Sequence, residues 1–522
     1  MNSILKRALS CVLAASMLMA ASSCGKKGNG GEVSEGTLGT EYPLNTDEKL
    51  TWTTWTSSHS DYLDYKQQPF FKGLIEQTGV DIDFKFDVVG ESFYLMLASG
   101  DLPDVIQYDW YNVKGGPEKY INDGVIIDLT DAINKWAPNL KKYLDEHPDV
   151  ARDLKTDSGQ YYVFPFLRGD EKLTVFRGMM ARQDLLDKFN LDMPETIDEW
   201  ENALTVMKDN GVKIPLSFAG ADCEPVMAAY NVTNSFYLNK GKVEFGPMQK
   251  GFKEYLTTMN RWYTEGLIDP DYGTVTRQLL TGKLSAGNVG AAAGECGGVM
   301  GVSLAAGKAK DPNFDLVGAK YPVLKKGQKP EFGTAETIYN QNSGVAITTQ
   351  CKNVELAVKV LDYAYSEAGH LLYNFGIEGE SYEMVDGEPK YTEAMYNYDK
   401  GDITASLKRY IMSIDHAPCI QDLRMYQQRL SYQQQKDAID LWADTNMRNH
   451  ILPHISMNDE ENEINSEIWA DINTFVQETT TKFILGKKPI EEFDSYVEEL
   501  KKMGIDKVIA IRQSAYDRYM AR

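Results

Sequence analysis

Hydrophobic and polar residues alternate over residues 80–88, with an apolar side chain at every second position: Val80, Ile82, Phe84, Phe86 and Val88. A period of two predicts a half-buried β-strand. Neighbouring patterns predict a strand over 49–55, a helix over 92–99 and a strand over 102–108. This strand–helix–strand order indicates an α/β layered fold.

Three later segments follow helical patterns. Thr196 and Glu199 have the spacing of a capping box, and the apolar residues that follow fall on one helical face. Residues 353–367 predict a second helix that ends at Gly369, and residues 489–504 predict a third.

The N-terminal segment has the pattern of an export signal. Two basic residues precede a nearly uncharged stretch over 8–21, which is too short to cross a bilayer. Small residues then lead to Cys24, as at the site where bacterial lipoproteins are cut and lipidated. We expect a signal peptide over 1–23, a lipid on Cys24 and a flexible tether over 24–48. The alternative is an ordinary cleaved signal with a chance cysteine.

Composition limits the classes of protein to consider. About 470 residues remain after the tether, which suggests two domains or lobes. The formal net charge of −22 argues against nucleic acid and anionic lipid as partners. Four scattered cysteines argue against a disulfide framework and leave a single bridge open: Cys223, Cys296, Cys351 and Cys419.

No motif of catalytic chemistry stands out. Residues 301–309 resemble a phosphate-binding loop, but the loop is one residue too long and ends in Ala309 where Ser or Thr would hold magnesium. His450 and His454 are four residues apart, but Pro453 interrupts the helix that would align them on zinc. The abundant acidic residues allow many glycosidase pairs, and the sequence does not separate such a pair from a solvated surface. We expect no catalytic residue, no metal ion and no cofactor.

Several segments of the chain, together with their order, resemble extracellular solute-binding lipoproteins of ABC transporters. The similarity is greatest to the large oligosaccharide-binding group that includes the alginate-binding proteins. It rests on the N-terminal lipid site and on residues 93–106 (FYLMLASGDLPDVI), 159–165 (GQYYVFP), 181–200 (ARQDLLDKFNLDMPETIDEW), 343–348 (SGVAIT) and 367–382.

The resemblance implies a type II fold, in which two α/β lobes are joined by hinge strands and hold the ligand in the cleft between them. It places the N-terminal lobe at 49–166 plus 324–417 and the C-terminal lobe at 167–323 plus 418–522. Some relatives carry a calcium loop after the region that matches Trp200. Here the corresponding segment, residues 207–215, is shorter, and too few of its oxygen-bearing side chains have the spacing of calcium ligands. We therefore expect no calcium there.

Ligands of open α/β sheets bind beyond the carboxyl ends of the strands, and this rule selects three loops. Sugars require aromatic platforms and short polar side chains, which these loops supply as Trp55, His59, Asp109, Trp110, Tyr111 and Glu295. The resemblance adds Arg182 as a polar side chain in the cleft. We expect Trp110 to face the cleft, whereas Trp52 and Trp262 fit core positions.

Taken with the resemblance, these observations predict a lipid-anchored monomer on the outer face of the cytoplasmic membrane, at the cell surface or in the periplasm. It would capture an oligosaccharide and deliver it to the permease subunits of an ABC importer, without catalysis. Its only membrane contact would be the N-terminal lipid. Two alternatives stay open: a surface glycosidase or polysaccharide lyase, and a binding protein for a peptide or another non-sugar solute.

Overall fold

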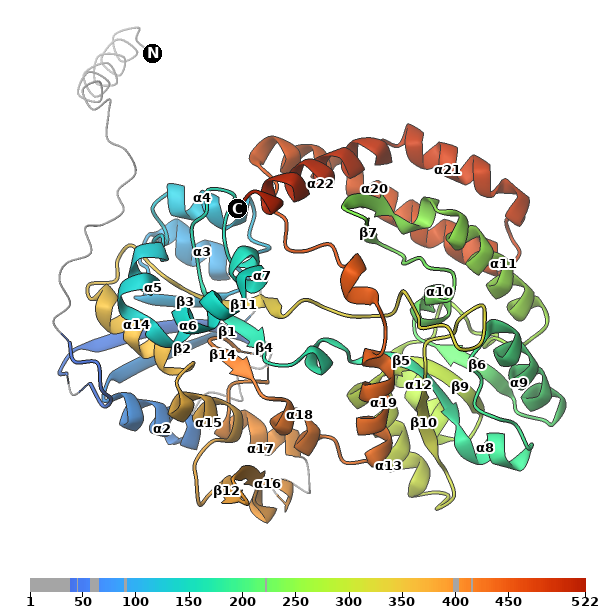
Figure 1. Cartoon of the computed structure of the whole chain (residues 1–522), viewed down its shortest axis with the longest axis horizontal. Coiled ribbons are helices and arrows are strands. Elements are labelled where there is room, and N and C mark those ends of the chain that lie inside the picture. The colour runs from blue at the N-terminus through green and yellow to red at the C-terminus, as the bar shows by residue number, and fades with distance from the viewer. Residues whose placement is uncertain are drawn as a thin grey trace, which may run out of the picture.

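The structure is a computed structural model that describes residues 38–44, 46–56, 65–88, 92–220, 223–397, 403–414 and 416–522. The predicted signal peptide, the lipid site Cys24 and the predicted ligand residue His59 lie outside these residues. The described chain forms two α/β lobes side by side (Figure 1). None of its helices combines the length and apolar character needed to cross a membrane.

The N-terminal lobe is built on a six-stranded sheet with the order β14-β4-β11-β3-β1-β2 in the described chain. The strands are β1 (Lys49–Thr56), β2 (Asp81–Val88), β3 (Val105–Tyr108), β4 (Phe164–Arg168), β11 (Tyr339–Ile347) and β14 (Cys419–Gln421). β1 runs parallel to β2 and β3, and β11 runs antiparallel to β3 and β4. β2 lies at the edge and buries one face, as its alternating pattern predicts.

The C-terminal lobe is built on a four-stranded sheet with the order β10-β5-β9-β6 among the described residues. Its strands are β5 (Arg177–Arg182), β6 (Ile214–Phe218), β9 (Val289–Glu295) and β10 (Leu316–Ala319). β5 is antiparallel to β9 and β10, whereas β6 is parallel to β9. A Cβ atom at Gly178 would lie 2.4 Å from the indole nitrogen of Trp442, so the close packing of a helix on β5 requires glycine there.

Helices cover both sheets (Figure 1). In the N-terminal lobe they are α2 (Pro69–Thr78), α3 (Ser92–Ser99), α4 (Gly116–Asn122), α5 (Thr130–Trp136), α6 (Pro138–Glu146), α7 (Pro148–Asp153), α14 (Val354–Tyr363) and α15 (Glu367–Phe375). A small unit beside them comprises β12 (Tyr382–Val385), β13 (Glu388–Tyr391), α16 (Glu393–Asn397), α17 (Ile403–Tyr410) and α18 (Leu423–Arg429).

The elements that surround the smaller sheet include a hairpin and the C-terminal helices. They are α8 (Gln183–Lys188), α9 (Ile197–Asp209), α10 (Glu224–Ala228), β7 (Phe236–Asn239), β8 (Lys242–Phe245), α11 (Lys250–Thr264), α12 (Arg277–Ser285), α13 (Val302–Lys308), α19 (Gln433–Ala443), α20 (Asp459–Ile484), α21 (Phe493–Lys502) and α22 (Ile505–Met520).

The capping box predicted at the start of α9 is confirmed. Thr196 Oγ1 accepts the Glu199 N–H at 3.2 Å, and the Glu199 carboxylate accepts the Thr196 N–H at 3.1 Å. Trp200, on the apolar face of this helix, is buried in the core of the lobe. The local sequence signals therefore fix both the start of α9 and the face that it buries.

The single helix predicted over 353–367 and ending at Gly369 is wrong at its C-terminal end. α14 already ends at Tyr363, and Ser366 begins α15 as its N-cap by accepting the Gly369 N–H at 3.1 Å. A Cβ atom at Gly369 would lie 1.8 Å from the Tyr363 carbonyl oxygen. Gly369 thus permits the close approach of two helices and does not mark a helix end.

The tether predicted over 24–48 is wrong in its last part, because residues 38–44 pack on the N-terminal lobe. Lys359 Nζ donates to the carbonyl oxygens of Leu38 and Gly39 at 2.8 and 3.0 Å, and Glu355 accepts the Leu38 N–H at 3.1 Å. Tyr42 donates its hydroxyl to the Lys359 carbonyl at 2.6 Å. Isolated apolar residues in a polar stretch are sufficient to dock it here.

The chain passes between the lobes several times, between β4 and β5, between β10 and β11, and between β14 and α19. The boundaries predicted after residues 166, 323 and 417 stay a prediction. A further connection is made by α22, which reaches back to the N-terminal lobe (Figure 1). Its Arg518 donates to Asp157 at 2.7 Å, and its Tyr519 hydroxyl donates to Asp153 at 2.8 Å.

Candidate functional site

A pocket of about 310 Å³ opens where the C-terminal lobe meets the segments that run to the N-terminal lobe. We call it the interlobe pocket. Its lining includes Phe176 and Arg177 of the segment that enters β5, Glu224 of α10 and Asn234 before β7. Residues 333–336, which lead to β11, and parts of 447–452, which follow α19, complete its wall.

Arg177 is the central polar group of the interlobe pocket. One guanidinium nitrogen lies 2.9 Å from a Glu224 carboxylate oxygen, and the other lies 3.5 Å from Glu295. Arg177 and Glu295 face each other in the register of β5 and β9, which places the pair at one end of the sheet. All three side chains keep about 30% of their surface exposed, at 32%, 27% and 30%. They are therefore held in place and still open to a ligand.

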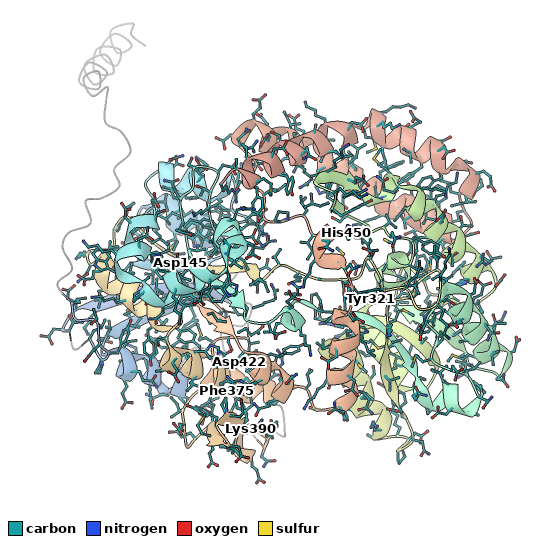
Figure 2. The ribbon with its side chains drawn as sticks, viewed as in Figure 1. Asp145, Tyr321, Phe375, Lys390, Asp422 and His450 are labelled. Atoms are coloured by element: carbon teal, nitrogen blue, oxygen red, sulfur yellow. The ribbon has the colours of Figure 1, made fainter. Side chains whose placement is uncertain are left out.

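The backbone of Arg177 is fixed by Tyr321, which Figure 2 labels in the C-terminal lobe. The buried Tyr321 hydroxyl donates to the Arg177 carbonyl at 2.6 Å and accepts the Thr334 N–H at 3.0 Å. Thr334 Oγ1 donates to the same carbonyl at 2.9 Å. Burial raises the pKa of Tyr321 above its usual range, so the hydroxyl remains a donor. This network ties the start of β5 to the segment that leads to β11.

An ion pair joins the lobes beside the interlobe pocket. Arg168, at the end of β4, contacts the Glu336 carboxylate and donates to the Thr337 carbonyl at 2.7 Å. His454 Nε2 lies 2.7 Å from Thr337 Oγ1 and 3.1 Å from the Tyr339 carbonyl oxygen. Burial lowers the pKa of His454 to about 4, so this imidazole is neutral at pH 7. The connecting segments are thus linked by polar contacts at the pocket edge.

The structure contradicts the expectation that Trp110 faces the cleft. Its exposed fraction is 0%, and its indole N–H donates to the Ile106 carbonyl at 3.1 Å. Its ring packs edge-on against Phe93 and Tyr120. The residue follows a strand end, but its side chain packs into the core of the N-terminal lobe. Trp52 and Trp262 are both buried, as the sequence predicts.

The other predicted residues of the N-terminal lobe are engaged in internal contacts. The Trp55 indole N–H donates to Ser92 Oγ at 2.7 Å, and the ring is largely buried. Asp109 accepts the backbone N–H of Asn112 at 3.1 Å and so closes a turn. Tyr111 donates its hydroxyl to the Ile455 carbonyl at 2.7 Å, and burial raises its pKa to about 12. Their roles as ligand contacts stay predictions.

Arg182, which the resemblance adds as a polar side chain in the cleft, does not lie beside Glu295, and its place in the cleft stays a prediction. It occupies the opposite end of β5, where both Nε and one Nη donate to Asp184 at 2.7 and 2.6 Å. It also stacks 4.1 Å from the Phe314 ring centroid. Arg177, five residues earlier, takes the position beside Glu295.

Phe176, Arg177 and Glu224 were not predicted from the sequence. Phe176 is 36% exposed and lies next to Arg177 in the pocket lining. The signal available in the sequence was the start of β5, because an antiparallel neighbour of β9 begins where β9 ends. The rule that ligands bind beyond the carboxyl ends of strands selects only residues that follow a strand. It therefore omits residues at the start of one.

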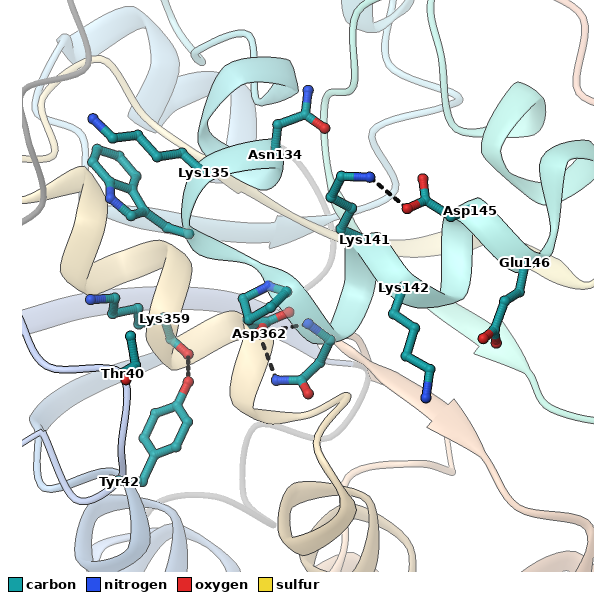
Figure 3. Close-up of a pocket in the computed structure, with 13 residues that line it drawn as sticks. Thr40, Tyr42, Asn134, Lys135, Lys141, Lys142, Asp145, Glu146, Lys359 and Asp362 are labelled. Atoms are coloured by element: carbon teal, nitrogen blue, oxygen red, sulfur yellow. Dashed lines mark hydrogen bonds and ion pairs between the residues drawn. The ribbon is translucent and has the colours of Figure 1, made fainter.

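A larger pocket of about 660 Å³ lies within the N-terminal lobe, between residues 40–42 and helices α5, α6 and α14 (Figure 3). Some of its polar groups bond to one another. Asn139 Nδ2 donates to Asp362 at 2.7 Å, and Lys141 pairs with Asp145 at 2.5 Å. This pocket lies away from the segments that join the lobes, whereas the interlobe pocket is lined by two of them, and for this reason the interlobe pocket is the better candidate site.

Within the described part of the chain, no three His, Cys, Asp or Glu side chains gather as metal ligands. His450 Nδ1 lies 3.0 Å from the Leu238 carbonyl oxygen, whereas His454 turns to Thr337, so the two imidazoles serve different contacts. The expectation that the protein needs no metal ion stays a prediction. The cysteines that the structure describes are buried and form no disulfide with one another.

Comparison with known proteins agrees with this architecture. The family described as "Bacterial extracellular solute-binding protein" matches residues 56–370. The fructooligosaccharide ABC transporter substrate-binding protein FusA of Streptococcus pneumoniae is 27% identical over 98% of each chain. Lipoprotein LipO of Bacillus subtilis is 23% identical over 84% of this chain and 86% of its own.

A solved structure, alginate-binding protein AlgQ2 without calcium ion, superposes with a TM-score of 0.69 at 24% identity, covering 91% of this chain and 100% of that one. This likeness confirms the expected two-lobe type II fold. The family match covers more than half of the chain, and the members compared are binding proteins rather than enzymes. The chain belongs to the family of bacterial extracellular solute-binding proteins.

Proposed function

We propose that this protein captures an oligosaccharide in the interlobe pocket and delivers it to the permease subunits of an ABC importer. The observation that carries the proposal is the group formed by Phe176, Arg177, Glu224 and Glu295. An exposed aromatic ring offers a platform for the C–H face of a sugar. The adjacent guanidinium and carboxylates offer a donor and acceptors for neighbouring hydroxyls.

The similarity to a fructooligosaccharide-binding protein over nearly the whole length of both chains supports a sugar as the ligand. A lipid on Cys24 would hold the protein at the outer face of the cytoplasmic membrane and is supported by the small-residue site before it. Docking of residues 38–44 on the N-terminal lobe leaves 13 residues of the sequence between Cys24 and the docked segment.

The charged groups of the pocket favour binding over the glycosidase alternative. Glu224 and Glu295 both pair with the Arg177 guanidinium. Neither carboxyl group stands apart in an apolar pocket, which is the usual setting of a glycosidase general acid. Each can instead accept a hydrogen bond from a sugar hydroxyl.

A thermal-shift screen against oligosaccharides and peptides tests the proposal. A selective ligand at a hundredfold excess over its Kd should raise the free energy of unfolding by about 2.7 kcal/mol. Chromatography of the recovered ligand should show it intact. Stabilisation by peptides alone, or release of new reducing ends from a bound sugar, would contradict the proposal and favour one of the two alternatives.

A further inference from the structure

The interlobe pocket has a distinctive balance of charge. Among its described lining residues Arg177 is the one cation, and it stands beside two carboxylates, Glu224 and Glu336. Glu295, at the end of β9, lies outside this lining but pairs with the same guanidinium. The lining therefore holds two carboxylates and one guanidinium before any ligand enters, and a third carboxylate shares that guanidinium.

The cations near the pocket are already occupied by the protein. Arg177 is shared by two carboxylates, and Arg168 binds Glu336 together with a backbone carbonyl. Arg512 lies outside the lining, with its guanidinium stacked 4.1 Å from the Phe236 ring centroid. The Arg448 guanidinium is bound to the carboxylate and backbone of Glu171 at 3.1 and 2.8 Å. None of these described side chains offers an unshared guanidinium within the pocket to a ligand carboxylate.

This arrangement treats hydroxyl groups and carboxylates differently. A sugar hydroxyl can donate to Glu224 and accept from a remaining N–H group of Arg177, so it fits without disturbing the ion pairs. A ligand carboxylate can accept from the same N–H groups, but it adds a further negative charge to a guanidinium that two carboxylates already share, and it cannot donate to Glu224. The net charge of −22 adds a longer-range repulsion.

We propose that the interlobe pocket selects neutral oligosaccharides and rejects uronate oligosaccharides. This inference rests on the proposed function and extends it to the charge class of the ligand. The selection comes from the arrangement in which Arg177 is neutralised on both sides. The pocket thereby lacks a cation for a uronate while keeping its hydrogen-bonding capacity for hydroxyls.

The test compares neutral and acidic oligosaccharides of matched length in calorimetric titrations. The probes are fructo-, galacto- and manno-oligosaccharides on one side, and mannuronate and galacturonate oligosaccharides on the other. We expect the tightest ligand to be neutral and every uronate oligomer to bind at least a hundredfold more weakly. Raising the salt from about 0.05 to 0.5 M should leave the neutral Kd nearly unchanged, because no ionic attraction is screened.

Two variants make the test specific to the pocket. Glu224→Gln and Glu295→Gln together should narrow the preference for neutral over acidic oligomers at least tenfold. Asp145→Asn and Glu146→Gln together, an equal change of charge at the pocket of the N-terminal lobe, should leave that preference unchanged. A thermal melt of each variant verifies that it is folded.

A uronate oligomer that binds as tightly as the best neutral one would overturn this inference and leave the proposed sugar-binding function standing. An unchanged preference in the folded double variant would overturn the inference in the same way. If no oligosaccharide of either kind binds, the proposed function fails and the inference falls with it.

Discussion

At the scale of single residues, Phe176 and Trp110 show how burial decides the role of an aromatic side chain. Both adjoin a strand of a sheet, but Phe176 is 36% exposed beside Arg177 and Trp110 has no exposed surface. An exposed ring next to polar groups is available to stack on a sugar. A ring enclosed on all sides contributes to the free energy of folding instead.

We predict that Phe176→Ala weakens oligosaccharide binding by about 1–3 kcal/mol, because it removes one apolar platform. Its free energy of unfolding should fall by about 1 kcal/mol or less. Trp110→Ala should instead destabilise the fold by about 3–5 kcal/mol, because it leaves a large cavity in the core. Chemical denaturation and calorimetry on both variants give the two free energies. A Trp110→Ala variant as stable as the wild type would contradict the burial of Trp110 in the core.

His454 gives a prediction for the dependence of stability on pH. Its pKa is lowered to about 4 in the folded protein, chiefly by burial, from about 6.5 in the unfolded chain. Between these values the unfolded chain binds more protons, so stability falls as the pH falls through this window.

From pH 7 to pH 5, the wild type should lose about 2 kcal/mol more than His454→Gln in urea denaturation. His147→Gln changes an exposed histidine of the N-terminal lobe and should follow the wild type. Equal losses in the wild type and His454→Gln would exclude a strongly lowered pKa for His454.

At the scale of secondary-structure elements, local patterns predict well where the local signal is complete. The alternation in β2 and the capping box of α9 give the correct strand, helix start and buried face. The break between α14 and α15 was missed because Ser366 acts as an N-cap between two segments that both have a helical pattern. The docking of residues 38–44 was missed because it depends on Glu355 and Lys359, which are more than 300 residues away.

Lys359 lies on α14 and binds both Glu355 and residues 38–39 of the docked segment. Lys359→Met leaves the Glu355 carboxylate buried without its cation and should cost about 3–5 kcal/mol. It should also expose residues 38–44 to protease. Adding Glu355→Gln should recover much of the stability but leave the segment susceptible.

The control for this prediction is Lys141→Met, which breaks a more exposed pair with Asp145 and should change stability by about 0.5 kcal/mol or less. If the free energy of unfolding of Lys359→Met equals that of Lys141→Met and residues 38–44 stay resistant to protease, the docking of this segment does not depend on Lys359.

At the scale of the whole molecule, the two-lobe fold was predictable from strand and helix order together with the family resemblance. The residues of the candidate site were only partly predictable. Glu295 was selected because it stands at the carboxyl end of β9, whereas Arg177 was not selected because it stands at the start of β5. Arg182 lies at the other end of β5, and its place in the cleft stays a prediction. The burial of Trp110, which excludes it from the candidate site, depends on packing between segments that are distant in the sequence.

The account rests on one claim, that an oligosaccharide binds between the lobes through the Arg177 group. The most direct measurement is a calorimetric titration of the oligosaccharide identified by thermal shift into the wild type, Arg177→Gln and Lys142→Gln. Lys142 lines the pocket of the N-terminal lobe and serves as the matched control. We predict tight binding by the wild type and Lys142→Gln, and a loss of about 1.5–3 kcal/mol in folded Arg177→Gln, because hydrogen bonds to a charged group are removed. Unchanged affinity in Arg177→Gln would contradict the account and place the ligand elsewhere.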